Sequence, residues 1–258
     1  MIFPGLVSVT FRQLSPEQIV ALAIRAQLRG VEWGGDIHVP SGDRDCAQTV
    51  RALCRNAGLS VVSYGSYYRA GADPRENFAP VLETAMELGA PNIRVWAGTL
   101  GSALAHDDDR QRVCDDLRRI AELSSAAQIT VSLEFHDDTL ADNPDATLAL
   151  LDRVDHTALR TYWQPPHGQS ADDATAGLVR LLPHLSHLHV FHWWPNPQTR
   201  LPLAQGAERW SRFLETASRA PGDRFALLEF VPDNSPDAFL RDAAELRTWL
   251  ARSTSPHA

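Results

Sequence analysis

Four side chains that could hold a metal ion come from four separate apolar segments of the chain, close to the end of each segment. They are Glu134, Gln164, His189 and Glu229. Carboxylate, amide and imidazole groups are ligands for ions such as Mn, Mg, Co or Zn, at distances of about 2.0–2.3 Å. A carboxylate in an apolar setting is costly unless it is paired, protonated or bound to metal. The pattern therefore predicts one divalent metal ion as the cofactor.

The alternation of residue types within these segments predicts which side chains point the same way, because residues two apart on a strand share a face. In residues 130–136 the odd positions are apolar, whereas the even positions end in Glu134 and His136. The same rule puts His189 on one face with His187, which lies deeper in its segment. We expect the polar faces to meet, with His187 in a structural role.

Two further segments bring a cation and an amide to the same kind of face. Arg94 shares its face with Trp96, and Gln164 shares its face with Tyr162. Glu32 is expected to pair with Arg94, because Arg94 is the obvious cation facing inward. That pairing would be structural rather than catalytic.

Structural roles also stay open for the candidate ligands. Glu134 and Glu229 could belong to a buried salt-bridge network, and His189 could be a hydrogen-bonded core histidine. A calorimetric metal titration of the wild type and of Glu229→Gln distinguishes these roles from metal binding.

The elements that must position these side chains alternate along the whole chain. Helical patterns separate the short β-type runs, and one helix begins at a Ser15-Pro16-Glu17-Gln18 capping box. About eight such units favour an α/β chain folded as a single (β/α)8 TIM barrel over residues 1–252, with a flexible C-terminal tail at 253–258. An open doubly wound sheet stays the alternative, although no GxGxxG follows the first strand. The predicted strands are 6–11, 30–33, 59–64, 92–96, 129–135, 159–164, 185–191 and 225–231.

Composition excludes several classes of protein. The 258 residues carry a formal net charge of −8, which opposes binding to nucleic acid. No apolar run approaches the roughly 18 residues of a membrane span, and the first residues contain no basic region typical of a signal peptide. Three cysteines without CxxC spacing are typical of free thiols. We therefore expect a cytoplasmic protein with no membrane partner.

The chain resembles the xylose isomerase-like barrel superfamily, the group of sugar isomerases and epimerases. That group includes ketose 3-epimerases, inosose dehydratases and hydroxypyruvate isomerases. The resemblance runs through Leu133-Glu134-Phe135-His136, His187-Leu188-His189 and Arg200-Leu201-Pro202-Leu203.

The resemblance implies a metal site at the same four positions, with two departures. Gln164 stands where the family has aspartate, and His192 stands where the family tends to carry another aspartate. A neutral amide is still an oxygen donor, but it removes one negative charge and should weaken metal binding.

The resemblance also implies proton transfer at a carbon next to a carbonyl, with Glu134 and Glu229 as the catalytic acid and base. His167 and Arg200 are expected to contact substrate oxygens. Five tryptophans expected near strand ends suit the apolar face of a sugar: Trp33, Trp96, Trp163, Trp193 and Trp194. The further substrate contacts that we expect are Trp33, His38, Arg94, Trp96, His136 and His192.

The first function to expect is a divalent-metal-dependent sugar isomerase or epimerase that works through an enediolate. Because no Gly-rich phosphate loop is present, its substrate would be an unphosphorylated sugar or polyol derivative, with manganese as one candidate ion. The alternatives are a lyase or dehydratase acting on a keto-inositol or oxidised glycoside, and a metal-free carbohydrate-binding barrel. A homodimer is a further expectation, because members of the family often dimerise.

Overall fold

The described residues, 1–72 and 77–253 of a computed structural model, form a closed barrel of eight parallel strands. Each strand pairs with the next, and the barrel closes where Ile2 to Leu6 pair with Arg224 to Leu228. The predicted (β/α)8 barrel is therefore confirmed, and the open sheet is excluded. The strands are β1 (Ile2–Val7), β2 (Gly30–Gly34), β3 (Ser60–Arg69), β4 (Asn92–Trp96), β5 (Thr130–Leu133), β6 (Leu159–Trp163), β7 (Leu185–Val190) and β8 (Arg224–Leu228).

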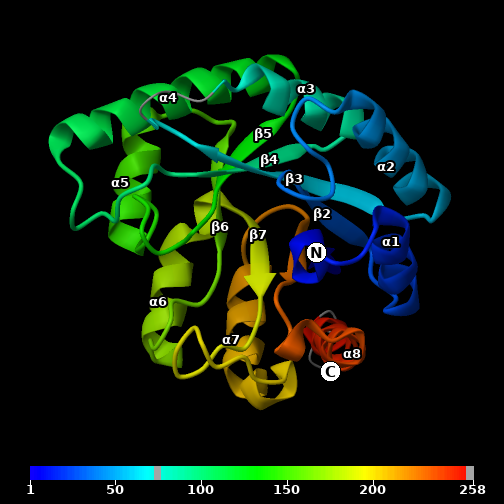
Figure 1. The fold of residues 1–258 in the computed structure, drawn as a ribbon. Helices are drawn as coiled ribbons and strands as arrows, with labels where there is room; N and C mark the ends of the chain where they lie inside the picture. The colour runs from blue at the N-terminus through cyan, green and yellow to red at the C-terminus, as the bar shows by residue number, and fades with distance from the viewer. Residues whose placement is uncertain (73–76, 254–258) are drawn as a thin grey trace.

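Helices surround the strands, and the last helix lies beside the first strand (Figure 1). They are α1 (Pro16–Arg25), α2 (Arg44–Asn56), α3 (Ala79–Leu88), α4 (Asp107–Ala126), α5 (Pro144–Val154), α6 (Ala171–Leu181), α7 (Ala207–Ser218) and α8 (Pro236–Ser253). The short 3-10 helices are η1 (Ser8–Phe11), η2 (Leu182–His184), η3 (Leu203–Gly206) and η4 (Pro232–Asn234). No helix in the described ranges is long and apolar enough to cross a membrane.

The capping box predicted at the start of α1 is present. The Ser15 hydroxyl accepts from the Gln18 N–H, and the Gln18 side chain accepts from the Ser15 N–H at 2.8 Å. These two bonds satisfy donors that the first helical turn leaves unpaired. The predicted tail begins at Ser253, which ends α8, and its other residues, 254–258, lie outside the described residues.

The first strand was predicted too late in the sequence. It covers Ile2–Val7, and residues 8–11 form η1 instead. Pro4 and Gly5 resemble strand breakers, yet Pro4 still accepts a hydrogen bond from the Arg29 N–H at 2.9 Å. Gly5 is required by close packing, because a Cβ there would lie 2.6 Å from Leu227 Cδ2.

The core has two parts, as strand alternation predicts. The larger part packs the outward faces of the strands against the helices. The smaller part fills the barrel axis with Val7, Val9, Val62, Tyr162 and Leu227. This inner layer forms the floor on which the polar residues of the barrel rest.

Candidate metal centre

The four predicted ligands come from β5, β6, β7 and β8, at the ends where these strands finish. Glu134 follows β5, Gln164 follows β6, His189 is the next-to-last residue of β7, and Glu229 follows β8. The Glu134 N–H donates to Val95 O at 2.9 Å, and the Glu229 N–H donates to Val190 O at 3.0 Å. Because neighbouring strand ends hold these two backbones, the positions of the carboxylates are well defined.

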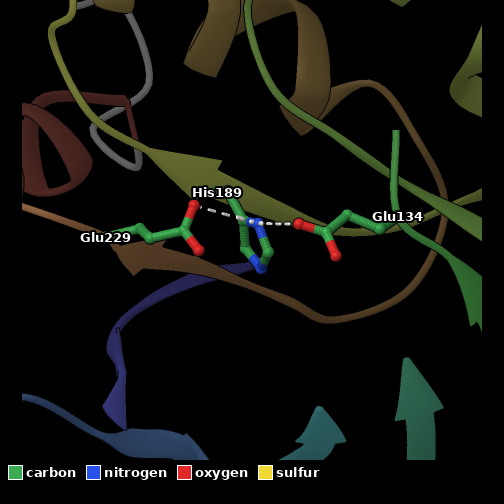
Figure 2. A group of neighbouring side chains, drawn as sticks. All are labelled: Glu134, His189 and Glu229. Atoms are coloured by element: carbon green, nitrogen blue, oxygen red, sulfur yellow. Dashed lines mark ion pairs between the residues drawn. The ribbon is translucent and has the colours of Figure 1, made fainter. Parts of the chain in front are cut away.

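Three side-chain oxygens surround one nitrogen, Nδ1 of His189. Gln164 Oε1 lies 3.2 Å from it, Glu229 Oε2 lies 3.3 Å from it, and Glu134 Oε1 lies 3.9 Å from it. The two carboxylates approach the ring from opposite sides (Figure 2). All four side chains are buried.

This spacing fits an ion at the centre of the group. Ligand atoms that are bound at about 2.0–2.2 Å lie roughly 3.0–3.5 Å from one another. The Nδ1 distances to Gln164 and Glu229 fall in that range, and a small movement of Glu134 would bring it there. The ligand atoms of Glu134, His189 and Glu229 all lie within 4.8 Å of one another. These residues therefore fit a divalent metal ion.

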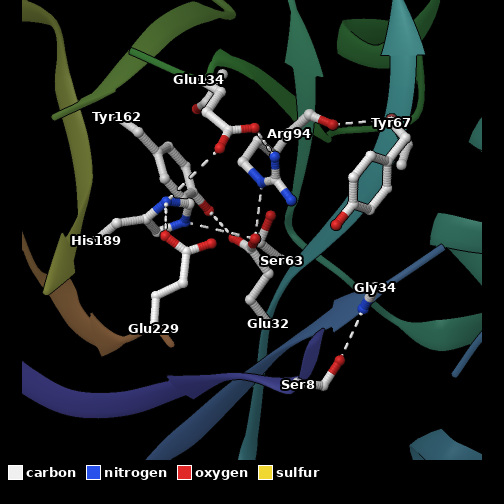
Figure 3. Close-up of polar contacts among 12 residues, drawn as sticks. Ser8, Glu32, Gly34, Ser63, Tyr67, Arg94, Glu134, Tyr162, His189 and Glu229 are labelled. Carbon is white, nitrogen blue, oxygen red and sulfur yellow. Dashed lines mark hydrogen bonds and ion pairs between the residues drawn. The ribbon is translucent and has the colours of Figure 1, made fainter. Parts of the chain in front are cut away.

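A second layer of polar groups supports the first (Figure 3). Arg94 Nε donates to Glu32 Oε1 at 2.8 Å, which confirms their predicted pairing, and Arg94 Nη1 donates to Glu134 Oε2. The Tyr162 hydroxyl donates to Glu32 Oε2 at 2.7 Å. Burial alone would raise the pKa of Glu32, but the Arg94 guanidinium and the His189 ring hold that pKa well below its ordinary value. Glu32 is therefore ionised inside the barrel.

The other ring nitrogen of His189 faces this ionised group. Its Nε2 lies 3.6 Å from Glu32 Oε1, is buried, and has no hydrogen-bond partner among the described residues. With an ion among the oxygens around Nδ1, the Glu32 carboxylate would accept the Nε2 proton and leave the Nδ1 lone pair for that ion. The tautomer required of a metal ligand is thus the one that Glu32 supports.

The balance of charge also suits a divalent ion. Glu134 has a guanidinium partner in Arg94, whereas the ion-pair partner of Glu229 within the described part of the chain is His189. With Glu32, these residues contain three carboxylates against one guanidinium. Two negative charges remain, and a divalent cation would neutralise them. The salt-bridge network considered as an alternative role is therefore present. In it Arg94 pairs with Glu32 and Glu134 but forms no ion pair with Glu229 within the described residues.

One aromatic wall at the rim contains two of the predicted substrate contacts. The His167 ring stacks on Trp193 at 5.5 Å between centroids, and Arg200 lies over Trp193 at 5.1 Å. Arg200 Nη1 donates to Asn234 Oδ1 at 3.0 Å. The loops after β6, β7 and β8 build this wall.

A second wall lies on the β4 and β5 side. The His136 ring stacks on Trp96 at 4.7 Å, and Tyr67 lies next to Trp96 with ring centroids 6.3 Å apart. Arg94 also lies beneath Tyr67, with the guanidinium 5.3 Å from the ring centroid. Flat apolar surfaces at the rim are therefore present, as the sequence predicts.

Three predicted contacts lie away from the ligand group. Trp33 is fully buried among the outer core residues, and His38 is bound to the Ser8 hydroxyl at 2.9 Å and to Leu14 O. His192 is buried against Gly206, where a Cβ would lie 2.6 Å from its Nδ1. Trp33 packs in the outer core and His38 holds a loop, so both are corrected from substrate contacts to structural residues, whereas substrate contact by His192 stays a prediction. Trp163 is likewise buried, packed on Phe213.

Sequence reasoning missed Asp137, which follows His136. Its Oδ2 lies 3.0 Å from Nδ1 of His167, and its backbone oxygen lies 2.6 Å from Nδ1 of His136. Asp137 could have been considered from its position in the sequence, because it follows directly after a segment that ends in the inward-facing polar residues Glu134 and His136. The His167 partnership connects two loops and was not visible in the sequence.

The chain is similar in sequence to one characterised enzyme. A 3-dehydroshikimate dehydratase from Bacillus anthracis is 29% identical over 163 residues, which are 56% of this chain and 58% of that protein. The matched region thus spans little more than half the length of the relative.

Solved structures match over nearly the whole chain. A probable 3-DHS dehydratase involved in petrobactin synthesis, also from Bacillus anthracis, has a TM-score of 0.79 with 22% identity, covering 95% of this chain and 99% of that one. A xylose isomerase-like TIM barrel protein from Mycobacterium smegmatis in complex with magnesium has a TM-score of 0.73 with 13% identity, covering 98% of each chain. D-psicose 3-epimerase from Clostridium cellulolyticum H10 has a TM-score of 0.71 with 13% identity, also covering 98% of each chain.

These three likenesses show the fold. Residues 20–252 match the family described as xylose isomerase-like TIM barrel, in agreement with the resemblance seen in the sequence. The chain belongs to the xylose isomerase-like TIM barrel family.

Proposed function

We propose that this chain is a dehydratase, a lyase that removes water from a small cyclic ketone carrying a hydroxyl group β to its carbonyl. The similarity in sequence to 3-dehydroshikimate dehydratase supports this class of reaction, and 3-dehydroshikimate is a carboxylated ketone of this kind. The proposal reverses the order expected from the sequence, in which an isomerase or epimerase came first. A keto-inositol belongs to the same chemical class.

The observation that carries the proposal is the set of three oxygens around Nδ1 of His189. Glu134, Gln164, His189 and Glu229 would hold one divalent ion there. When bound, such an ion supplies electrostatic stabilisation for the negative charge that develops on the carbonyl oxygen during proton removal.

The chain's own residues supply the proton transfers. Glu229 accepts the proton from the carbon between the carbonyl and the leaving hydroxyl, because its carboxylate is not engaged by Arg94 as Glu134 is. The electron pair of that C–H bond forms the new double bond as the C–O bond breaks. His167 gives a proton to the departing hydroxyl, which leaves as water. For a 3-dehydroshikimate-like ring, a tautomeric shift then makes the product aromatic.

The two aromatic walls would bind the ring of the substrate. Trp193 and Trp96 offer flat surfaces, and Arg200 offers a planar donor fork that suits a carboxylate. Arg200 is held by Asn234 and lies on the apolar face of Trp193, so its guanidinium is presented in a defined orientation. A planar, anionic, cyclic substrate matches these groups.

The test is to incubate the purified protein with 3-dehydroshikimate and Mg²⁺ or Mn²⁺, and to follow the aromatic product by its ultraviolet absorbance. We expect product in the wild type, none after chelation, and at least a hundredfold slower reaction in Glu229→Gln. Glu122→Gln, an equivalent change on the exposed side of α4, is the control and should react like the wild type.

A specific alternative outcome is conversion of D-psicose to its 3-epimer without any reaction of the cyclic ketone. Two carboxylates on opposite sides of His189 are also the arrangement that an epimerase needs, since one can remove a proton and the other can return it on the other face (Figure 2). Incorporation of deuterium into D-psicose at the epimerised carbon would then refute the dehydratase proposal.

A further inference from the structure

We propose that Asp137 is a positioning residue, which fixes the His167 ring so that Nε2 is the atom that delivers the proton to the leaving hydroxyl. This inference rests on the proposed function for the step that it serves. It concerns a residue outside the ligand group, at a contact that the sequence did not predict.

The contact joins the loops after β5 and β6. Asp137 Oδ2 lies 3.0 Å from Nδ1 of His167. Hydrogen bonding to His167 lowers the pKa of Asp137, so the carboxyl group is ionised and accepts the Nδ1 proton. A histidine whose Nδ1–H is held by a carboxylate is fixed in one tautomer and one orientation.

Two aromatic rings that touch each other, Trp193 and Phe191, pack beside the same ring, with their centroids 4.5 Å apart. The His167 ring is nearly parallel to Trp193, with an interplanar angle of 9° and centroids 5.5 Å apart. Phe191 stacks near it at 6.2 Å with an angle of 23°. The plane of the imidazole is therefore set by aromatic packing, and its rotation within that plane is set by Asp137.

The other nitrogen of the ring is left for a ligand. His167 Nε2 is buried and has no hydrogen-bond partner among the residues that the structure describes. A buried polar atom without a partner is costly, and in native proteins such an atom calls for an explanation such as a functional role. A substrate hydroxyl that reached Nε2 would supply the missing partner.

The chemistry then follows from the orientation. A doubly protonated His167 keeps its Nδ1 proton in the bond to Asp137 and can release its Nε2 proton to the hydroxyl oxygen as the C–O bond breaks. Water leaves, His167 becomes neutral, and the Asp137 carboxylate keeps its charge.

Asp137 also holds His136, but through its backbone. Nδ1 of His136 lies 2.6 Å from the Asp137 carbonyl oxygen, which a side-chain substitution does not remove. His136 thus provides an internal reference for the effect of the Asp137 carboxylate on His167.

The first measurement is the tautomer of each histidine ring, read from nitrogen-15 chemical shifts of the full-length protein. We expect His167 to be the Nδ1–H tautomer in the wild type and in Asp137→Asn, whose amide oxygen still accepts. In Asp137→Ala the His167 signals should move toward the Nε2–H tautomer, while those of His136 stay unchanged. A wild-type His167 in the Nε2–H form, or no change in Asp137→Ala, overturns the inference without bearing on the proposed function.

The second measurement is kinetic. Asp137→Ala should lower kcat for the cyclic ketone by roughly ten- to a hundredfold with little change in KM, because general acid catalysis contributes about 10²–10⁴ and the ring stays stacked. A β-acetoxy analogue, which expels acetate and needs no acid, should react equally fast in the wild type and the variant. Asp138→Asn is the control, because asparagine tolerates the left-handed backbone there (φ 60°).

A variant as slow on the acetoxy analogue as on the hydroxy ketone would overturn the role of Asp137, since the defect would then be structural. A wild type inactive on both compounds, with the tautomer result as expected, would refute the proposed function and the step assigned to His167.

Discussion

Replacing Glu229 by glutamine should stabilise the metal-free protein, and added metal should stabilise the variant much less than it stabilises the wild type. Without an ion, the Glu229 carboxylate is buried close to the Glu134 carboxylate, and their ligand atoms lie within 4.8 Å of each other. At an effective dielectric constant of about 20, two like charges at that distance repel by about 3.5 kcal/mol. The attraction of Arg94 for Glu229 offsets part of this, so we expect a net gain of about 1–3 kcal/mol in Glu229→Gln.

Metal shifts the difference in stability toward the wild type by about 2.3 kcal/mol. A free ion concentration about a hundred times the dissociation constant stabilises the wild type by about 2.7 kcal/mol. If loss of one anionic ligand weakens binding about a hundredfold, the same concentration stabilises the variant by about 0.4 kcal/mol. Urea unfolding with chelator and with Mn²⁺ measures both differences.

Glu229→Gln needs a control that changes charge in the same way on the surface. Glu122→Gln makes the same chemical change on the surface of α4 and should follow the wild type under both conditions. If Glu229→Gln were less stable than the wild type in chelator, and Mn²⁺ stabilised the two proteins equally, Glu229 would be a structural partner of His189 and no ligand.

Other substitutions test separate parts of the structure. Gln164→Asp should raise affinity for Mn²⁺ by about tenfold or more in calorimetry, because it adds a charge 3.2 Å from Nδ1, and it should lower the stability of the metal-free protein. Burial raises the pKa of Asp242 to about 6, so the protein should lose stability as the pH rises from about 4 to about 6; Asp242→Asn should remove that loss, because the amide can still accept from the Leu203 N–H. Arg224→Met should cost at least about 2 kcal/mol in urea unfolding without changing metal affinity, because Arg224 donates to the carbonyls of Leu185, Ala220 and Pro221 far from the ligand group.

Strand alternation was enough to predict the interior of the barrel. Glu134, His189 and Glu229 each share a strand face with the residue two positions earlier. This alternation can be read from a few consecutive residues, without knowledge of the fold. The same period, applied to β2, would have placed Trp33 outside, since Glu32 next to it points inward. The error on Trp33 came from treating its position near a strand end as exposure at the rim.

Loop contacts could not be predicted in the same way. His38 binds Ser8 across a gap of thirty residues, and Asp137 binds His167 across the same separation. Such contacts depend on how two loops pack on neighbouring strands, which no local pattern encodes. The start of β1 was misplaced for a related reason, because Gly5 is selected by the approach of Leu227 from the other end of the chain.

The neutral residue at position 164 is consistent with the charges around it. The family resemblance predicts aspartate there, and an aspartate would place a third carboxylate next to Nδ1 of His189 and bring the buried groups to an excess of three negative charges. Gln164 keeps an oxygen at 3.2 Å while the excess stays at two, the charge of one divalent ion. Arg94 contributes to the same balance, because it binds both Glu32 and Glu134. A protonated Nδ1 would need one acceptor, whereas a metal ion would use the oxygens of both Gln164 and Glu229, which lie 3.2 Å and 3.3 Å from Nδ1.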